Sequence, residues 1–347
     1  MIKFDCDYLE GTHPKILDAL VKTNMEQTVG YGMDDYCSKA KQLIKDACDA
    51  PDADVHLLVG GTQTNALVIS SALRPYQGVV AVESGHINVH EAGAIEATGH
   101  KVLALPTEDG KMRADVLENY CAEYWADVTK EHIVQPAMLY ISQPTESGML
   151  YTKDELLELR RVCDKYSLIF FVDGARLIYS LANSNTDVRL PDLAKICDVF
   201  YIGGTKAGLL FGEAVVITND AIKKDFRNMM KRAGAMLSKG RLLGVQFSEL
   251  FTDGLYLEIS AHAMKCAEEI HDIFENAGFE FLYNSPTNQL FPIIEDSLQE
   301  KLSEEFSFEF WKRVDEKRSA VRFCSSWATK EESIEKLRQA VAKYVQE

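Results

Sequence analysis

The sequence predicts an α/β fold whose mostly parallel sheet is covered by helices on both faces. Short apolar runs alternate along most of the chain with amphipathic stretches of helical period. The runs are almost continuously apolar, as strands buried on both faces are. From about residue 241 the alternation gives way to a long helical stretch, which indicates a second domain. We therefore expect a large domain over residues 1–245, with an N-terminal arm over 1–15, and a small α+β domain over 246–347.

Seven apolar runs are the expected strands of the large domain. Helical patterns separate them, and strands alternating with helices are typical of a parallel sheet. In chain order the runs cover residues 55–59, 79–82, 101–105, 137–142, 168–172, 199–202 and 214–218.

Helices are expected in the gaps between these strands and in the second domain. The periodic stretches of the large domain cover residues 63–73, 88–98, 113–125, 153–166 and 221–233. The long helical stretch runs through residue 276. Apolar runs at 279–282, 289–294 and 321–324 and a final helix over 330–345 follow it.

Composition is that of a globular enzyme and excludes several classes of partner. Of 347 residues, 46% are hydrophobic and 26% are charged, which are not the values of a disordered chain. The formal net charge of −16 argues against nucleic acid and anionic membranes as partners. No run approaches a membrane span, and the start lacks the apolar stretch of a signal peptide. The eight cysteines are scattered without metal-ligand spacing, so we expect a reduced cytoplasmic protein with no metal site.

An acid and a lysine follow two of the expected strands. Asp173 follows the run at 168–172, and Lys206 comes after Gly203-Gly204-Thr205, which follows the next run. Open α/β sheets bind ligands at the carboxyl ends of their strands. A lysine placed there can form a Schiff base with an aldehyde cofactor, and a buried carboxylate can keep a pyridinium nitrogen protonated. A surface lysine after a turn and an N-cap aspartate are the ordinary alternatives. The two segments together favour a site for pyridoxal phosphate (PLP).

A glycine-rich turn joins the first expected strand to a helix. Gly60, Gly61 and Thr62 allow close backbone approach, and the helix N-terminus offers free N–H groups to a phosphate. The same pattern is often only a turn with an N-cap. It is neither a Walker A loop nor the full dinucleotide fingerprint.

Two further residues have side chains suited to a site. His86 follows the second strand, where an imidazole could stack on a planar cofactor and move protons near neutral pH. A zinc pair with His90 is the alternative, but no further ligands complete it. Arg322 lies inside an apolar run and requires an anion, either a structural carboxylate or the carboxylate of an amino-acid substrate.

Together these segments resemble the L-threonine aldolases, within the β-eliminating lyase group of the PLP enzymes of fold type I, the aspartate aminotransferase-like fold. The resemblance covers nearly the whole chain. The pairing of Asp-Gly-Ala-Arg with Gly-Gly-Thr-Lys is fairly specific to this family among fold-type-I enzymes. The matching segments are 7–14, 30–35, 60–63, 85–87, 91–93, 140–146, 173–176, 203–206, 211–213 and 322–327.

The resemblance implies cofactor-binding roles at several positions. It implies that Lys206 forms the covalent bond to PLP, that Asp173 pairs with the pyridinium nitrogen and that His86 stacks on the ring. Phosphate binding is implied for the turn before the helix, at Gly61, Thr62 and Gln63.

Substrate binding and subunit contacts are implied in the same way. Arg176 and Arg322 would bind the substrate carboxylate, and His132 takes the place of a second active-site histidine. Lys239 falls where some members send a residue to the phosphate of a neighbouring subunit. With Tyr31 it implies a homodimer or homotetramer with shared active sites.

The chain departs from the family pattern near its start. Many relatives have an Arg-Ser-Asp-Thr motif whose serine helps to hold the substrate carboxylate. Neither Cys6 nor Leu9 supplies that hydroxyl here. Gln143 and Ala207 each stand where asparagine is usual. These changes leave the substrate preference open.

The function implied is PLP-dependent retro-aldol cleavage of L-threonine or L-allo-threonine to glycine and an aldehyde. His86 or His132 would take the proton of the β-hydroxyl group, and distance to that group decides between them. Another PLP-dependent lyase or an aminotransferase acting on a small amino acid is the alternative enzyme. A catalytically idle α/β binding protein is the alternative from another class, although no structural need explains Lys206, Asp173 and His86 together.

Overall fold

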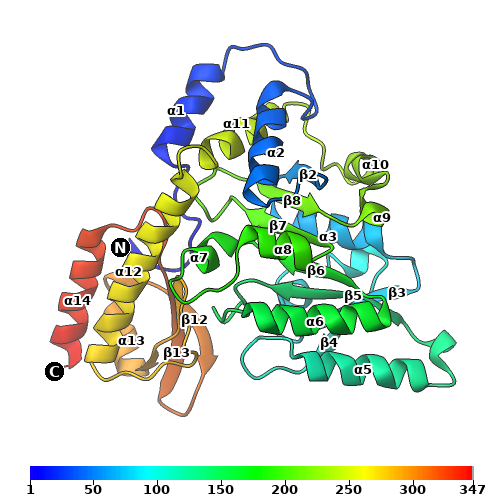
Figure 1. Ribbon diagram of the computed structural model, residues 1–347. Coiled ribbons are helices and arrows are strands. Elements are labelled where there is room, and N and C mark those ends of the chain that lie inside the picture. Colours follow the sequence, from blue (N-terminus) through cyan, green and yellow to red (C-terminus); the bar gives the residue numbers. More distant parts are fainter. Residues whose placement is uncertain (346–347) are drawn as a thin grey trace.

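A seven-stranded sheet forms the centre of the computed structural model, which describes residues 1–345 (Figure 1). Its strand order is β2-β8-β7-β6-β5-β3-β4, and β8 runs antiparallel to both of its neighbours while the other pairs are parallel. The predicted mostly parallel α/β sheet is therefore confirmed. Its strands are β2 (Asp54–Leu58), β3 (Gln77–Val82), β4 (Val102–Leu105), β5 (Gln135–Ser142), β6 (Ile169–Asp173), β7 (Val199–Gly203) and β8 (Glu213–Ile217).

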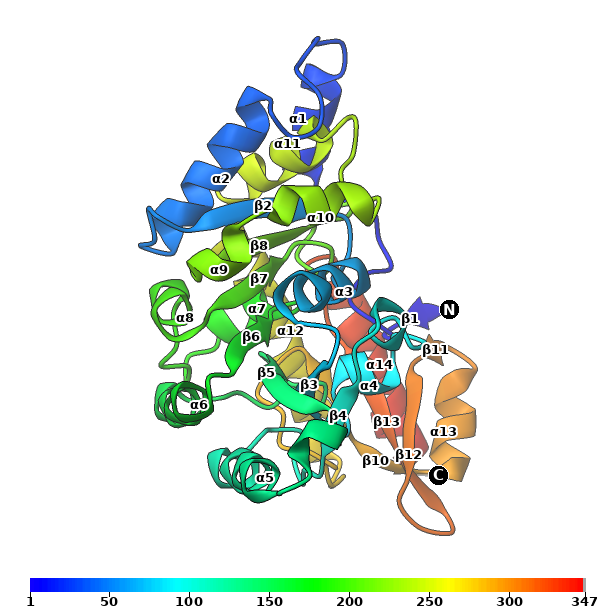
Figure 2. The same ribbon diagram turned by 90° about the vertical axis from the view of Figure 1, so that its right-hand side faces the viewer.

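The sheet is buried on both faces because its strands alternate between two cores. Phe170 and Val172 of β6 pack into one hydrophobic cluster, whereas Phe171 packs into the other. Figure 2 shows α5, α6 and α8 on one side of the sheet and α3 on the other. The first side is covered by α1 (Pro14–Thr23), α2 (Asp35–Ala47), α5 (Ala114–Ala126), α6 (Lys153–Tyr166), α7 (Leu177–Leu181), α8 (Leu190–Ile196), α11 (Arg241–Leu250) and the start of α12 (Leu255–Asn276). The second side is covered by α3 (Gly61–Ala72), α4 (His86–Val89), α9 (Asp220–Lys223) and α10 (Phe226–Arg232).

Three predicted helices are broken in the structure. The stretch at 88–98 forms only α4 and the short 3₁₀ helix η1 (Glu96–Thr98), with Ala92 and Gly93 between them at positive φ. Asp225, at φ 59°, separates α9 from α10 within the predicted helix at 221–233. Asp253 and Gly254 separate α11 from α12 in the same way. A residue in the left-handed region cannot continue an α-helix, so no single helix runs through any of these positions.

Residues 289–345 form a small antiparallel sheet with helices against it. β13 (Arg318–Cys324) lies between β10 (Ile293–Glu295) and β12 (Glu309–Arg313) and also pairs with β9 (Gln289–Leu290). The apolar run at 279–282 was predicted as a strand, but only Phe281 forms an isolated bridge, with Pro292. The accompanying helices are α13 (Asp296–Ser303) and α14 (Glu331–Val345).

The N-terminal residues pack against this C-terminal region. β1 (Ile2–Lys3) pairs in parallel with β11 (Phe306–Ser307), and Phe4 joins the same hydrophobic cluster as Phe306 and Phe323. Helix α12 contributes side chains to this cluster and to the core of the large sheet. The boundary at residue 245 therefore stays a prediction. None of the helices within residues 1–345 combines the length and the apolar character needed to cross a membrane.

Two glycines bring the loops after β6 and β7 into close contact. A Cβ atom on Gly174 would lie 1.9 Å from the carbonyl oxygen of Tyr201, and one on Gly203 would lie 2.2 Å from that of Ala175. The N–H group of Gly203 donates to the carbonyl oxygen of Gly174 at 2.9 Å. Because no side chain fits at either position, the segments carrying Asp173 and Lys206 can approach each other.

Candidate active site

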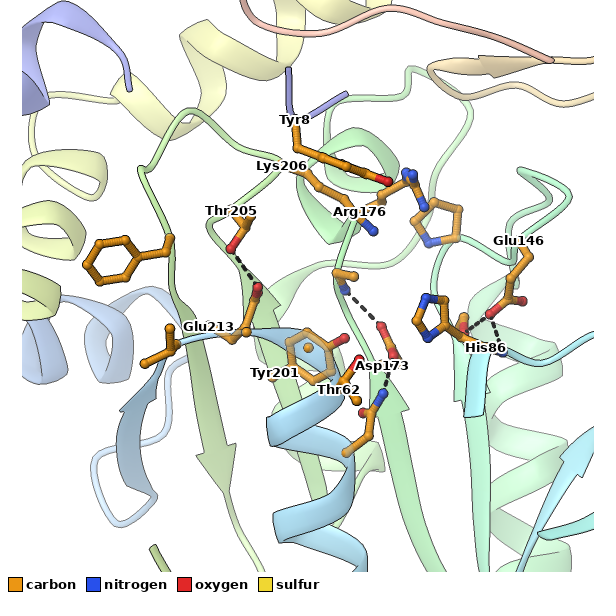
Figure 3. A pocket seen from close by; sticks show the side chains of 18 of the residues that line it. Tyr8, Thr62, His86, Glu146, Asp173, Arg176, Tyr201, Thr205, Lys206 and Glu213 are labelled. Carbon is orange, nitrogen blue, oxygen red and sulfur yellow. Dashed lines mark hydrogen bonds between the residues drawn. The ribbon is translucent and has the colours of Figure 1, made fainter. Parts of the chain in front are cut away.

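A cavity of about 300 Å³ opens at the carboxyl ends of the parallel strands (Figure 3). Its wall contains the turn from Val59 to Thr62, the ends of β5 and β6, and the turn between β7 and β8. Tyr8, from the N-terminal arm, also lines it. Small-molecule sites in α/β proteins lie at this edge of the sheet.

Asp173 ends β6 and is held ionised in the cavity. Its Oδ2 accepts hydrogen bonds from the Tyr140 hydroxyl at 2.5 Å and from the Asn65 amide at 3.1 Å, and its Oδ1 accepts one from the Ala175 N–H at 3.0 Å. Burial acts to raise the pKa of Asp173, but the charge of His86 and these hydrogen bonds outweigh it and leave the pKa below its usual value. Such a carboxylate can keep a cationic ring nitrogen protonated.

Lys206 lies in the turn between β7 and β8, and its ammonium group lies in the cavity. Its Nζ is 5.8 Å from the centre of the Tyr8 ring, and the Tyr179 hydroxyl donates to its carbonyl oxygen at 2.6 Å. Burial, together with the positive charge of Arg176, lowers the pKa of Lys206 despite three nearby carboxyl groups. A lowered pKa increases the share of neutral amine, which is the form that attacks an aldehyde.

His86 is linked to Asp173 through two buried side chains. Its Nδ1 lies 2.8 Å from Oε1 of Glu91, so Nδ1 carries a proton and Nε2 is the nitrogen left for the cavity. The Asn65 amide donates to that same Glu91 oxygen at 2.7 Å as well as to Asp173. Burial acts to lower the pKa of His86, but Glu91 and the charge of Asp173 raise it above its usual value.

The N-terminus of α3 provides the expected anion cradle. Gly60 is its N-cap residue, no side chain caps it, and Gly61 and Thr62 line the cavity. A Cβ atom on Gly61 would lie 3.2 Å from the Tyr201 hydroxyl, so this wall is tight. The side chain of Gln63 accepts a hydrogen bond from the Val59 N–H at 3.3 Å and closes the preceding turn. Gln63 is the third residue of α3, and its role toward the phosphate stays a prediction.

The two predicted carboxylate-binding arginines occupy different places. Arg176 lines the cavity, and its guanidinium donates to both oxygens of Asp7 at 2.7 and 3.0 Å. Arg322 does not line it. Its guanidinium is paired with Glu309, donates to Gln289 Oε1 at 3.1 Å and lies over the Trp311 ring.

Two other predicted site residues lie away from the cavity of their own chain. His132 is exposed in η2 (Lys130–His132), before β5, whereas the cavity is at the opposite, carboxyl end of that strand. An eight-residue strand spans roughly 26 Å, so the prediction that His132 is a base in this cavity is wrong. Lys239 is exposed in the loop before α11, where Tyr31 donates through its N–H to the carbonyl oxygen of Ser238. Its role toward a neighbouring subunit stays a prediction.

Comparison with known proteins gives the family. The protein-family model described as β-eliminating lyase matches residues 6–297 of this chain. The chain belongs to the β-eliminating lyase family. Low specificity L-threonine aldolase from a Pseudomonas species is 29% identical over 339 residues, covering 96% of this chain and 95% of that protein. A structure of Leishmania major threonine aldolase has a TM-score of 0.97 and 43% identity over 99% of this chain and 100% of that chain.

The fold extends to more distant proteins. A mutant aspartate aminotransferase of Thermus thermophilus superimposes with a TM-score of 0.71 at 13% identity, over 100% of this chain and 91% of that chain. The predicted fold type is therefore confirmed. Enzymes of the β-eliminating lyase family depend on PLP, as expected from the sequence. The cavity fits this cofactor, because it combines an ionised buried carboxylate, a lysine of lowered pKa and an uncapped helix N-terminus.

We predict that Glu91→Gln lowers the pKa of His86. The buried carboxylate accepts the Nδ1–H hydrogen bond and is one of the groups that raise this pKa, and a neutral amide removes its charge. Titration of the imidazole resonances by NMR measures the change. The exposed Glu96→Gln variant is the control and should leave the pKa in place. An unchanged His86 titration in Glu91→Gln would show that Glu91 does not set the charge of the ring.

Proposed function

We propose that this protein cleaves the Cα–Cβ bond of L-threonine and L-allo-threonine, giving glycine and an aldehyde. The observation that carries the proposal is the convergence of Asp173, Lys206 and His86 on one cavity. The threonine aldolases to which the chain is similar support the choice of reaction within the family. The cavity, of about 300 Å³, suits a small amino acid beside the cofactor.

The residues of the cavity would hold PLP at several points. Lys206 would bind its aldehyde carbon, Asp173 its ring nitrogen and His86 a ring face. The Gly61 and Thr62 end of α3 would bind its phosphate. When bound, PLP supplies an electron sink for the pair of electrons released from the cleaved bond.

The substrate is positioned and deprotonated by side chains of this chain. Arg176 presents its guanidinium to the substrate carboxylate from within the cavity, and Asp7 fixes its orientation. Nε2 of His86 takes the proton of the β-hydroxyl group while Glu91 holds the opposite nitrogen. With His132 at the other end of β5, His86 is the histidine available for this step.

Incubation with L-threonine and L-allo-threonine, with glycine and acetaldehyde as the measured products, tests this function. We expect both products in equal amounts from the wild type. Lys206→Ala should form neither, and it should lose the visible absorbance and the borohydride-trapped adduct of the bound cofactor. The exposed Lys336→Ala variant, on α14 and away from the cavity, is the control for loss of cofactor. A keto acid without aldehyde would instead identify an aminotransferase.

We further propose that Arg322 binds the substrate carboxylate after exchanging its partner Glu309. The carbonyl oxygen of Asp5 and Oε1 of Gln289 already hold this guanidinium. Its charge also acts on His90, whose ring centre lies 5.6 Å from that of the cavity residue His86. A substrate carboxylate can replace Glu309, whose side chain is half-exposed.

Arg322→Ala should therefore raise KM for L-threonine by roughly tenfold to a hundredfold, as loss of a charge-assisted pair does. Arg322→Lys should recover only part of this, because the planar fork is lost. Glu309→Gln should lower KM, since it frees the guanidinium. KM and melting temperature are measured on the same samples. A lowered melting temperature with KM unchanged in all three variants would make the pair purely structural.

We also propose that the protein is a homodimer or homotetramer with shared active sites, working in the cytoplasm. Large apolar side chains are exposed along the N-terminal segment, at Leu17, Val21, Met25, Val29, Tyr31 and Met33, and a second copy would cover them. The eight cysteines are unpaired, which suits a reducing compartment. Analytical ultracentrifugation at assay concentration should give at least a dimer. A fully active monomer would contradict shared sites.

A further inference from the structure

Glu213 is a buried carboxyl group in the cavity wall that the proposed reaction does not use. It is the first residue of β8 and is 4% exposed. Figure 3 shows it on the same side of the cavity as Thr205 and Tyr201, whereas His86 and Glu146 lie on the other side. A buried carboxyl group requires either a partner cation or a proton.

The hydrogen bonds of Glu213 differ between its two oxygens. Oε1 accepts from the Thr205 hydroxyl at 2.8 Å, and that hydroxyl in turn accepts from the Gly212 N–H at 3.0 Å. Among residues 1–345, Oε2 has only the N–H of Gly204 as a donor, at 3.3 Å, which is a long contact. Oε2 is therefore the oxygen available to carry a proton.

The surroundings of Glu213 favour its neutral form. The charged and titratable groups that face it are Lys206 in the turn before β8, Asp173 on β6 and Tyr201 on β7. Burial raises the pKa of Glu213 to about 8, and Asp173 acts in the same direction, while Thr205 and Lys206 oppose them. At neutral pH the group carries its proton.

The phosphate cradle lies on the same side of the cavity. Tyr201, which faces Glu213, closely approaches Gly61 at the start of α3. A phosphate dianion bound at that helix terminus would be repelled by a carboxylate in the same buried wall. A carboxylic acid there would instead be a hydrogen-bond donor to it.

We propose that Glu213 is a phosphate-binding residue, which donates a hydrogen bond from its protonated Oε2 to the phosphate of PLP. The inference rests on the PLP site of the proposed function. If Glu213 has this role, the affinity for the cofactor depends on the proton of Glu213. Only ligands that carry the phosphate show this dependence.

The test compares PLP with pyridoxal, which lacks the phosphate, on the full-length protein freed of cofactor. Kd for each ligand is measured by absorbance between pH 7 and pH 9. The titration of Lys206 affects both Kd values equally, so it cancels in the ratio of Kd for pyridoxal to Kd for PLP. The phosphate loses its second proton near a pH of about 6 and stays dianionic over this range. The preference of the wild type for PLP should fall about tenfold from pH 7 to pH 9, following the fraction of protonated Glu213.

Two variants separate Glu213 from the rest of the cavity. Glu213→Gln keeps an acceptor for Thr205 and a permanent donor, so its preference for PLP should be independent of pH. Glu146→Gln is the matched control. Glu146 is also a buried acid of raised pKa, but its Oε1 accepts hydrogen bonds from the Ser142 hydroxyl and from the backbone N–H of His86. Its profile should match that of the wild type.

A preference for PLP that does not change with pH in the wild type would overturn the inference, even if neither variant folds. The same fall in Glu213→Gln as in the wild type would overturn it too. In both cases the PLP site itself stands. Failure of both ligands to bind at any pH would instead overturn that site, and this inference with it.

Discussion

The negative charge of Asp173 is the feature around which the other side chains of the cavity are arranged. Burial alone would neutralise it, and three hydrogen-bond donors with a nearby imidazole keep it ionised. One of these donors, the Asn65 amide, also binds Glu91, which orients His86. The carboxylate proposed to bind the ring nitrogen of the cofactor and the imidazole proposed as the base therefore belong to one hydrogen-bond network. Substitution of Asp173 or of Glu91 would therefore alter the charge state of groups on the other side of the cavity.

An acidic protein can bind an anionic cofactor here because each acid near the cavity is compensated differently. The chain has a formal net charge of −16. Asp7 is paired with the guanidinium of Arg176, Glu91 with the imidazole of His86, and Glu213 keeps its proton. Burial also raises the pKa of Glu146, so Asp173 remains as the carboxylate for a cationic ring nitrogen. The local field at the end of α3 is set by uncapped N–H groups rather than by the net charge of the chain.

Local sequence pattern predicted the strands well and the site in part. All seven strands of the large sheet were predicted to within a residue or two, because buried parallel strands are continuously apolar. Of the predicted site residues, the cavity brings together Asp173, Lys206, His86, Gly61, Thr62 and Arg176. The break at Asp225 was missed because an aspartate takes the left-handed conformation without a sequence signal as plain as glycine, whereas the other two breaks contain Gly93 and Gly254. The short helices α7 and α13 lack enough turns to show a period.

The residues that sequence analysis missed act through partners far away in the chain. Asn65 lies 108 positions from Asp173, and Asp7 lies 169 positions from Arg176. Nothing local to Asp7 shows that it orients an arginine so far away in the chain. Burial acts to raise the pKa of Asp7, but the charge of Arg176 overcomes it and the pKa is lowered. The pair therefore stabilises the fold at pH values above the usual pKa of an aspartate, and this contribution is lost as the pH falls through the lowered value. Through this pair the N-terminal arm, fixed at β1 by the C-terminal region, also fixes the arginine proposed to bind the substrate.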